Sequence, residues 1–201
     1  MTPVPKNELG CACPEPAMKK RILWIIVSLS FFLFPLHQIS YATDLTLNNT
    51  PTQVCFSPNG GCTESIVSQI DKAKSEILVQ AFSFTSAPIA KALVNAHKRG
   101  IKVEAILDKS QKSERYTSAT FISNVGIPTY IDSKHAIAHN KIMIIDRETV
   151  ITGSFNFTKA AEEKNAENLL IIKNEDLAKV YIENWYKHKE HSELYGGERS
   201  N

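Results

Sequence analysis

The sequence has 201 residues, of which 43% are hydrophobic, and a formal net charge of +2 at pH 7. This length and composition are typical of a globular protein and exclude a second substantial domain. Residues 1–42 hold four of the 23 basic and two of the 21 acidic residues, so the rest of the chain is formally neutral. A basic surface patch would therefore have to be local.

The first 42 residues have the pattern of an N-terminal extension with an export signal. Lys19, Lys20 and Arg21 precede an uncharged apolar run at 22–36, and Ser40 and Ala42 are the small residues that a signal peptidase needs. These three features predict a cleaved signal, with cleavage after Ala42 and a periplasmic or secreted protein. Met18 is an alternative start.

An uncleaved anchor is the alternative to this signal. The run at 22–36 has 15 residues, whereas a membrane-spanning helix needs about 20. If the segment were retained, it would hold the protein at the inner membrane.

Hydrophobic periodicity predicts strands that alternate with helices in the first part of residues 43–201. The expected strands are 53–56, 76–84, 102–107 and 127–131, and the expected helices are 63–74, 86–97 and a weaker one at 116–124.

The second part changes character. Strands at 141–145 and 149–152 form a hairpin, and a strand at 169–172 precedes a closing amphipathic helix at 175–189. We therefore expect one α/β domain over 43–201 with a mixed, largely parallel sheet and helices on both faces.

Two cysteines, Cys55 and Cys62, remain after residue 42, and a short turn-like segment separates them. In an exported protein such a pair predicts a disulfide, with two free thiols as the alternative.

The stretch HNKIMIIDRETVITGSFN at 139–156 concentrates polar residues between apolar runs. Side chains alternate along a strand, so His139 and Lys141 share one face and Asp146 faces away, where it would fix backbone. Ser154 and Asn156 present a hydroxyl and an amide to one point, and Gly153 before them permits close backbone approach to an anion.

An imidazole, a cation and two neutral polar groups match a phosphoryl site, where catalysis consists largely of positioning and charge stabilisation. No metal is expected at this site. His135 and His139 would lie about 13 Å apart in an extended chain, too far for one ion.

The spacing HxK, four residues, D, six residues, GSxN resembles the phospholipase D superfamily. AFSFTSAPIAKAL and HKRGIKVEAILD are similar to its small bacterial endonucleases, and the resemblance spans residues 52–190. It implies a phospholipase D-like fold and a metal-independent phosphodiesterase.

In that reading His139 is the nucleophile that forms a phosphohistidine. Lys141 and Asn156 hold the phosphate, Ser154 donates to it, and Glu167 orients the imidazole.

The same mechanism needs a second imidazole to protonate the leaving oxygen, and this chain has one copy of the motif. We therefore expect a homodimer in which two copies of His139 share one site.

The expected substrate is DNA, cut with little sequence specificity, and RNA as a further substrate is left open. Lys109, Lys112 and Arg115 follow the strand at 102–107 and are the predicted contacts with the nucleic-acid backbone; a solvated loop is the alternative. Two other functions stay open: a phospholipase acting on membrane lipid, and an inactive module that binds phosphate or nucleic acid.

Overall fold

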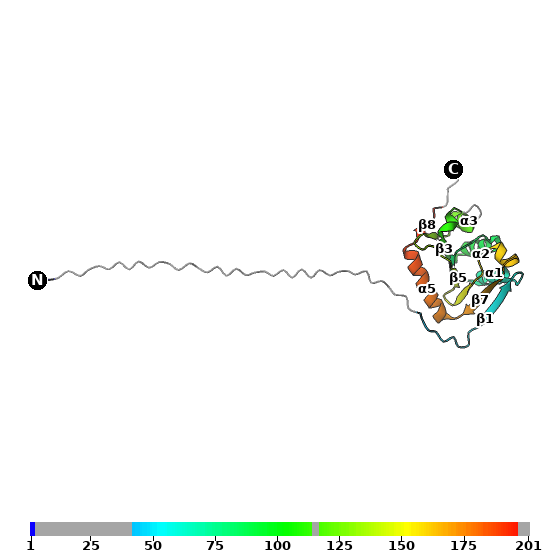
Figure 1. The fold of residues 1–201 in the computed structure, drawn as a ribbon, viewed down its shortest axis with the longest axis horizontal. Helices are drawn as coiled ribbons and strands as arrows, with labels where there is room; N and C mark the ends of the chain where they lie inside the picture. The colour runs from blue at the N-terminus through cyan, green and yellow to red at the C-terminus, as the bar shows by residue number, and fades with distance from the viewer. Residues whose placement is uncertain (3–41, 114–116, 197–201) are drawn as a thin grey trace. The chain divides into compact units, whose positions relative to one another are not determined.

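The computed structural model describes residues 1–2, 42–113 and 117–196. The predicted signal, Met18, the apolar run 22–36 and Arg115 lie outside these ranges. Residues Thr43–Asn201 belong to one compact unit (Figure 1). Within the described ranges, no helix is both long enough and apolar enough to span a membrane.

An eight-stranded sheet forms the centre of this unit, in the order β1-β7-β6-β5-β2-β3-β4-β8. The strands are β1 (Thr52–Ser57), β2 (Glu76–Ala81), β3 (Lys102–Asp108), β4 (Thr129–Asp132), β5 (Lys141–Ile145), β6 (Thr149–Gly153), β7 (Glu167–Lys173) and β8 (Glu193–Leu194).

The sheet is mixed, but the prediction that it is largely parallel was wrong. Only β2–β3 and β3–β4 are parallel pairs. The other five neighbouring pairs are antiparallel. The reason is that strand–helix alternation continues only as far as β4, after which β5, β6 and β7 follow one another in a meander, with β5 placed against β2.

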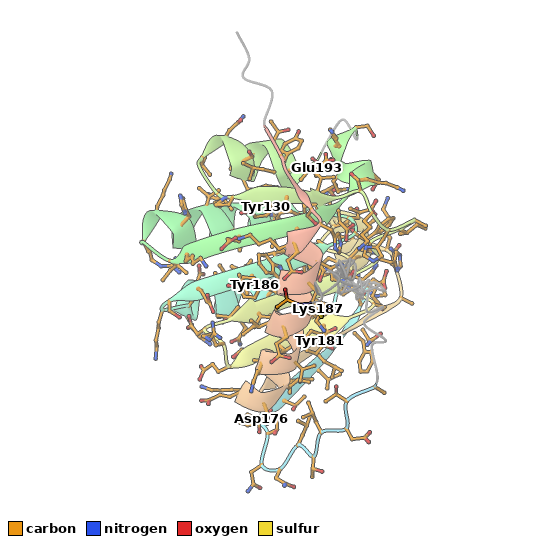
Figure 2. The ribbon with its side chains drawn as sticks, turned by 90° about the vertical axis from the view of Figure 1, so that its left-hand side faces the viewer. Tyr130, Asp176, Tyr181, Tyr186, Lys187 and Glu193 are labelled. Carbon is orange, nitrogen blue, oxygen red and sulfur yellow. The ribbon has the colours of Figure 1, made fainter. Side chains whose placement is uncertain are left out.

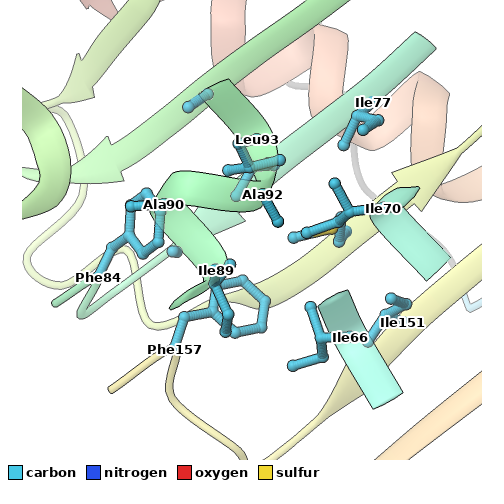
Figure 3. Packing of buried hydrophobic residues seen from close by; sticks show 14 of the residues in the cluster. Ile66, Ile70, Ile77, Phe84, Ile89, Ala90, Ala92, Leu93, Ile151 and Phe157 are labelled. Atoms are coloured by element: carbon cyan, nitrogen blue, oxygen red, sulfur yellow. The ribbon is translucent and has the colours of Figure 1, made fainter. Parts of the chain in front are cut away.

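Helices cover both faces, as the strand and helix pattern predicts. They are α1 (Cys62–Lys72), α2 (Ala87–Lys98), α3 (Ser118–Asn124), α4 (Lys159–Glu163) and α5 (Glu175–Glu190), with a 3-10 turn η1 (Lys109–Lys112). On one face Ile66 and Ile70 of α1 and Leu93 of α2 pack with the strand residues Ile77 and Ile151 (Figure 3).

Helix α5 lies alone across the other face (Figure 2). Asn174 caps its first turn by accepting a hydrogen bond from Leu177 N at 2.8 Å. Ile182 and Trp185 pack against the sheet, and Trp185 Nε1 donates to Val79 O at 2.9 Å. This bond satisfies the one polar atom of a side chain that is otherwise fully buried.

The two cysteines are free thiols in the structure, so the predicted disulfide is not what it shows. Both are buried and their side chains hydrogen-bond to each other. Burial raises the pKa of Cys55, and it raises that of Cys62 to about 12. The protonated thiols therefore behave as small apolar residues between β1 and α1.

Candidate active site

The two halves of the polar motif meet at one end of the inner strands of the sheet, on either side of the segment that follows β2. Ala81 of β2 pairs with Lys141, and Phe82 N donates to Asn140 O at 2.8 Å. Two residues on, Phe84 bridges to Phe157, just after the GSxN segment. This segment therefore contacts both sequence clusters, although they are separated by more than ten residues.

His139 is exposed at this end, with one side of its ring against Phe82. The ring centroids lie 4.6 Å apart and the planes are tilted by 50°. The next residue, Asn140, is held by Gln80, whose Nε2 donates to Asn140 Oδ1 at 3.2 Å. Phe82 and the bond to Asn140 thus position the imidazole, and its ring stays accessible from solvent, as a nucleophile must be.

Lys141, two residues after the histidine, is only 6% exposed. Its Nζ donates to His139 O at 2.9 Å and lies 5.1 Å from the centroid of the Phe82 ring. Burial lowers the pKa of Lys141, and the charge of Glu167 opposes that shift. An ammonium has three N–H donors, and within the described chain only one is used.

Ser154 and Asn156 come from the turn after β6. Ser154 Oγ accepts from Asn168 N at 3.0 Å, so this hydroxyl also ties the turn to β7. Asn156 Oδ1 is buried and has no hydrogen-bond partner among the described residues. A buried amide oxygen without a partner is costly in a purely structural position.

Gly153 is required by a close approach to the neighbouring strand. Its φ is 143°, and a Cβ at this position would lie 2.3 Å from Asn168 O of β7. The predicted approach of its backbone to an anion stays a prediction.

Asp146 lies at the opposite end of β5 from Lys141, and its carboxylate binds the chain before β2. It accepts hydrogen bonds from Lys74 N at 2.9 Å, Ser75 N at 2.7 Å, Ser75 Oγ at 2.8 Å and Glu76 N at 3.2 Å. Burial by itself would raise the pKa of Asp146, but these bonds hold it below the ordinary value. The contacts give Asp146 a structural position.

Glu167 begins β7 at the same end of the sheet as Lys141. Its Oε1 accepts from Asn165 Nδ2 at 3.2 Å. Its negative charge partly opposes the lowering of the Lys141 pKa by burial. In the structure the Glu167 carboxylate therefore interacts electrostatically with Lys141. Its predicted role in orienting the imidazole stays a prediction.

Two of the three predicted basic contacts, Lys109 and Lys112, lie in η1 and are exposed. Lys109 Nζ donates to His135 O at 3.1 Å. His135 begins the stretch that leads to His139. Lys109 therefore helps to hold the loop that carries the candidate nucleophile.

Sequence reasoning missed two residues that position this loop. Phe82 contacts both His139 and Lys141. Asp108 is buried at the end of β3, and its Oδ2 accepts from Ala138 N at 2.7 Å. The available signals were an aromatic residue and an aspartate, each at or just after the end of an apolar strand.

An exposed imidazole and a buried ammonium, at one end of a mixed α/β sheet, are groups that suit the binding of a phosphate. Comparison with known proteins identifies the family. Residues 66–188 match the family model described as cardiolipin synthase, PLD-like domain. The chain belongs to the phospholipase D superfamily and is a phosphodiesterase of that group.

A curated relative and two solved structures agree with this placement. A phospholipase D of Rickettsia conorii is 43% identical over 152 residues, which cover 76% of each chain. The structure of Nuc, a phospholipase D family member from Salmonella typhimurium, is 42% identical, with a TM-score of 0.70 and coverage of 73% of this chain and 98% of that one. NucT from Helicobacter pylori shares the fold at 24% identity, with a TM-score of 0.67 and coverage of 73% and 99%.

Proposed function

We propose that this protein is a metal-independent endonuclease that hydrolyses DNA, and RNA as well, through a phosphohistidine at His139. The observation that carries the proposal is the buried ammonium of Lys141, which uses one N–H donor within the described chain and lies against the same Phe82 ring as the exposed imidazole of His139. A phosphate placed there would gain a charge-assisted hydrogen bond from Lys141 and lie within reach of the ring. Asn156 and Ser154 complete the phosphate contacts.

In the first step a neutral His139 nitrogen attacks phosphorus, a P–N bond forms, and the P–O bond to the leaving group breaks. A second imidazole gives its proton to the leaving oxygen. In the second step that imidazole removes a proton from water, the water oxygen attacks phosphorus, and the P–N bond breaks. The negative charge that develops on the phosphoryl oxygens is stabilised by Lys141.

The second imidazole is His139 of a second copy of the chain in this proposal. Two apolar side chains beside the site support association. Ile137, two residues before the nucleophile, is 59% exposed, and Phe56 on the edge strand β1 is 67% exposed. Phe56 pairs in register with Asn168, the partner of Ser154. Contact between two copies would remove these side chains from water.

A groove along α2 and α3 supports a nucleic-acid substrate. It has a volume of about 580 Å³, and its lining includes Lys91, Lys98 and Phe121. The motif residues do not line it, but Thr85, which does, donates from its N to Phe157 O, the residue after the GSxN segment. Lysines that contact phosphates and an exposed ring that stacks on bases are the usual means of binding a single strand without sequence preference.

Phospholipid is the second candidate substrate. The observation that favours it is the 43% identity to a Rickettsia protein named phospholipase D. A third function, an inactive module that binds phosphate, has less support because all the motif residues are present.

An assay of three substrates separates these functions. The protein from Thr43 onward would be incubated with plasmid DNA, RNA and phosphatidylcholine vesicles, each in the presence of EDTA. We expect cleavage of nucleic acid, its loss in His139→Ala, and its retention in His97→Ala, which alters a histidine on α2. Turnover of lipid alone would replace the nuclease by the phospholipase, and no turnover would favour the binding module.

Sedimentation under the assay conditions tests the dimer. We expect a species of twice the chain mass in the active preparation. A monomer with full activity would contradict the shared site.

A further inference from the structure

A second cluster of histidines lies away from His139 and surrounds one carboxylate. Asp132 ends β4, and its side chain is completely buried. Its Oδ2 accepts from His135 Nδ1 at 2.8 Å, from His188 Nδ1 at 2.9 Å and from His191 Nε2 at 3.3 Å. Two of the imidazoles come from the C-terminal end of α5, so the cluster joins this helix to the edge of the sheet.

The three imidazole rings pack closely together around the Asp132 carboxylate. The three ring centroids lie 4.9, 5.1 and 5.4 Å from one another, which makes a nearly equilateral triangle. The four potential ligand atoms all lie within 4.8 Å of one another. Burial alone would raise the pKa of Asp132, but hydrogen bonds from the three imidazoles keep it well below the ordinary value. Three ring nitrogens thus converge on one negative oxygen.

We propose that Asp132, His135, His188 and His191 bind one zinc ion, or another divalent transition-metal ion of the same preference. Three imidazole nitrogens and one carboxylate oxygen are a common set of zinc ligands. With metal–ligand bonds of about 2.0 to 2.1 Å, a tetrahedral site places its ligand atoms about 3.3 Å apart. The oxygen-to-nitrogen distances of 2.8 to 3.3 Å are at or slightly below this value. The four ligand atoms lie within 4.8 Å of one another, so binding of the ion would also draw ring nitrogens closer together.

The surroundings already hold the ligands in place. The other oxygen of Asp132 accepts from Lys134 N at 3.1 Å and from His135 N at 3.3 Å, which leaves Oδ2 for the ion. Ser192 Oγ donates to His188 O at 2.7 Å and secures the end of α5 between the two histidines. Such outer contacts orient ligands and raise metal affinity.

The chemistry of the set selects the ion. Ca²⁺ and Mg²⁺ prefer sites built from oxygen ligands, whereas imidazoles suit zinc, copper and nickel. Four protein ligands fill a tetrahedral zinc site and leave no position for a substrate, so the ion is structural. The ion would hold the loop that begins at Asp132 and leads to His139 against the end of α5.

The inference is independent of the proposed reaction, because its test measures metal binding and not turnover. The full chain, purified in detergent and stripped of metal with a chelator, would be titrated with Co²⁺ and then with Zn²⁺. We expect one equivalent of Co²⁺ per chain with the visible absorption bands of tetrahedral cobalt, and their loss when Zn²⁺ displaces it. We also expect Zn²⁺ to raise the thermal unfolding midpoint.

Two variants and one control make the test specific. Each of His191→Gln and His135→Gln removes one ligand, and His135 is the safer for folding because its side chain is 42% exposed. Each should weaken Zn²⁺ binding by about 100-fold or more, beyond the effect of losing an outer contact. His97→Gln, on α2, should bind like the unaltered chain. Circular dichroism confirms that each variant is folded.

Two results would overturn the proposal. One is that the unaltered chain takes up no Co²⁺ or Zn²⁺ at micromolar concentration. The other is that both ligand variants bind Zn²⁺ as tightly as the His97→Gln control.

Discussion

Replacement of Asp146 by alanine tests whether this motif residue is structural or chemical. The variant loses a carboxylate that accepts four hydrogen bonds from residues 74–76. A hydrogen bond to a charged group contributes about 1.5 to 3 kcal/mol. Because water can reach most of these donors, we discount the sum and expect a loss of about 2 to 3 kcal/mol of unfolding free energy.

Urea denaturation measures this loss. With a slope of about 2 kcal/mol per molar urea, the midpoint should fall by about 1 to 1.5 M. Asp44→Ala, which alters an exposed aspartate, is the control and should leave the midpoint unchanged. At urea concentrations too low to unfold it, Asp146→Ala should keep most of its activity.

The contribution of Asp146 to stability has a defined dependence on pH, which a second variant, Asp146→Asn, measures. The folded-state pKa of Asp146 is below its ordinary value, which in unfolded chains is about 3.9. Its contribution is therefore fully present above about pH 4 to 5 and is lost as pH falls through the folded-state pKa. The difference in stability between the unaltered chain and Asp146→Asn should thus be largest near pH 7 and shrink in acid. A variant of normal stability that has lost its activity would refute the structural role.

Three further variants test the site and its support. Gly153→Ala should lower stability by about 3 kcal/mol in a urea titration and reduce activity, because its Cβ would collide with a carbonyl oxygen of β7 at a strained φ. Lys141→Met should lower the rate by about 100-fold or more yet unfold at the same or higher urea, since a buried charge is removed; exposed Lys134→Met is its control. Trp185→Phe should cost about 1 to 3 kcal/mol of unfolding free energy, because Val79 O loses the indole donor.

Local patterns predicted most elements of the fold. The apolar runs at 102–107 and 141–145 correspond to β3 and β5, and the amphipathic run at 175–189 corresponds to α5. The direction of strand pairing was not predictable in the same way. It depends on where β5 enters the sheet, and its place beside β2 is a long-range contact that no local pattern encodes.

The candidate site shows the same division. Strand alternation places His139 and Lys141 together and Asp146 at the far end of β5. The contact between Gly153 and the neighbouring strand β7 is a long-range one, so sequence spacing alone did not indicate it.

The sequence did not predict the histidine cluster, and the reason is again a long-range contact. DxxH at Asp132–His135 and HxxH at His188–His191 are each weak signals, and only the docking of α5 brings them together.

The most direct measurement is mass spectrometry of the protein quenched during turnover of a phosphodiester substrate. We expect a covalent phosphoryl adduct on the peptide that contains His139, and the mass of the attached group would identify the substrate. The adduct and the turnover should both disappear in His139→Ala. Undiminished turnover by His139→Ala, with no adduct on the unaltered chain, would contradict the assignment of His139 as the nucleophile.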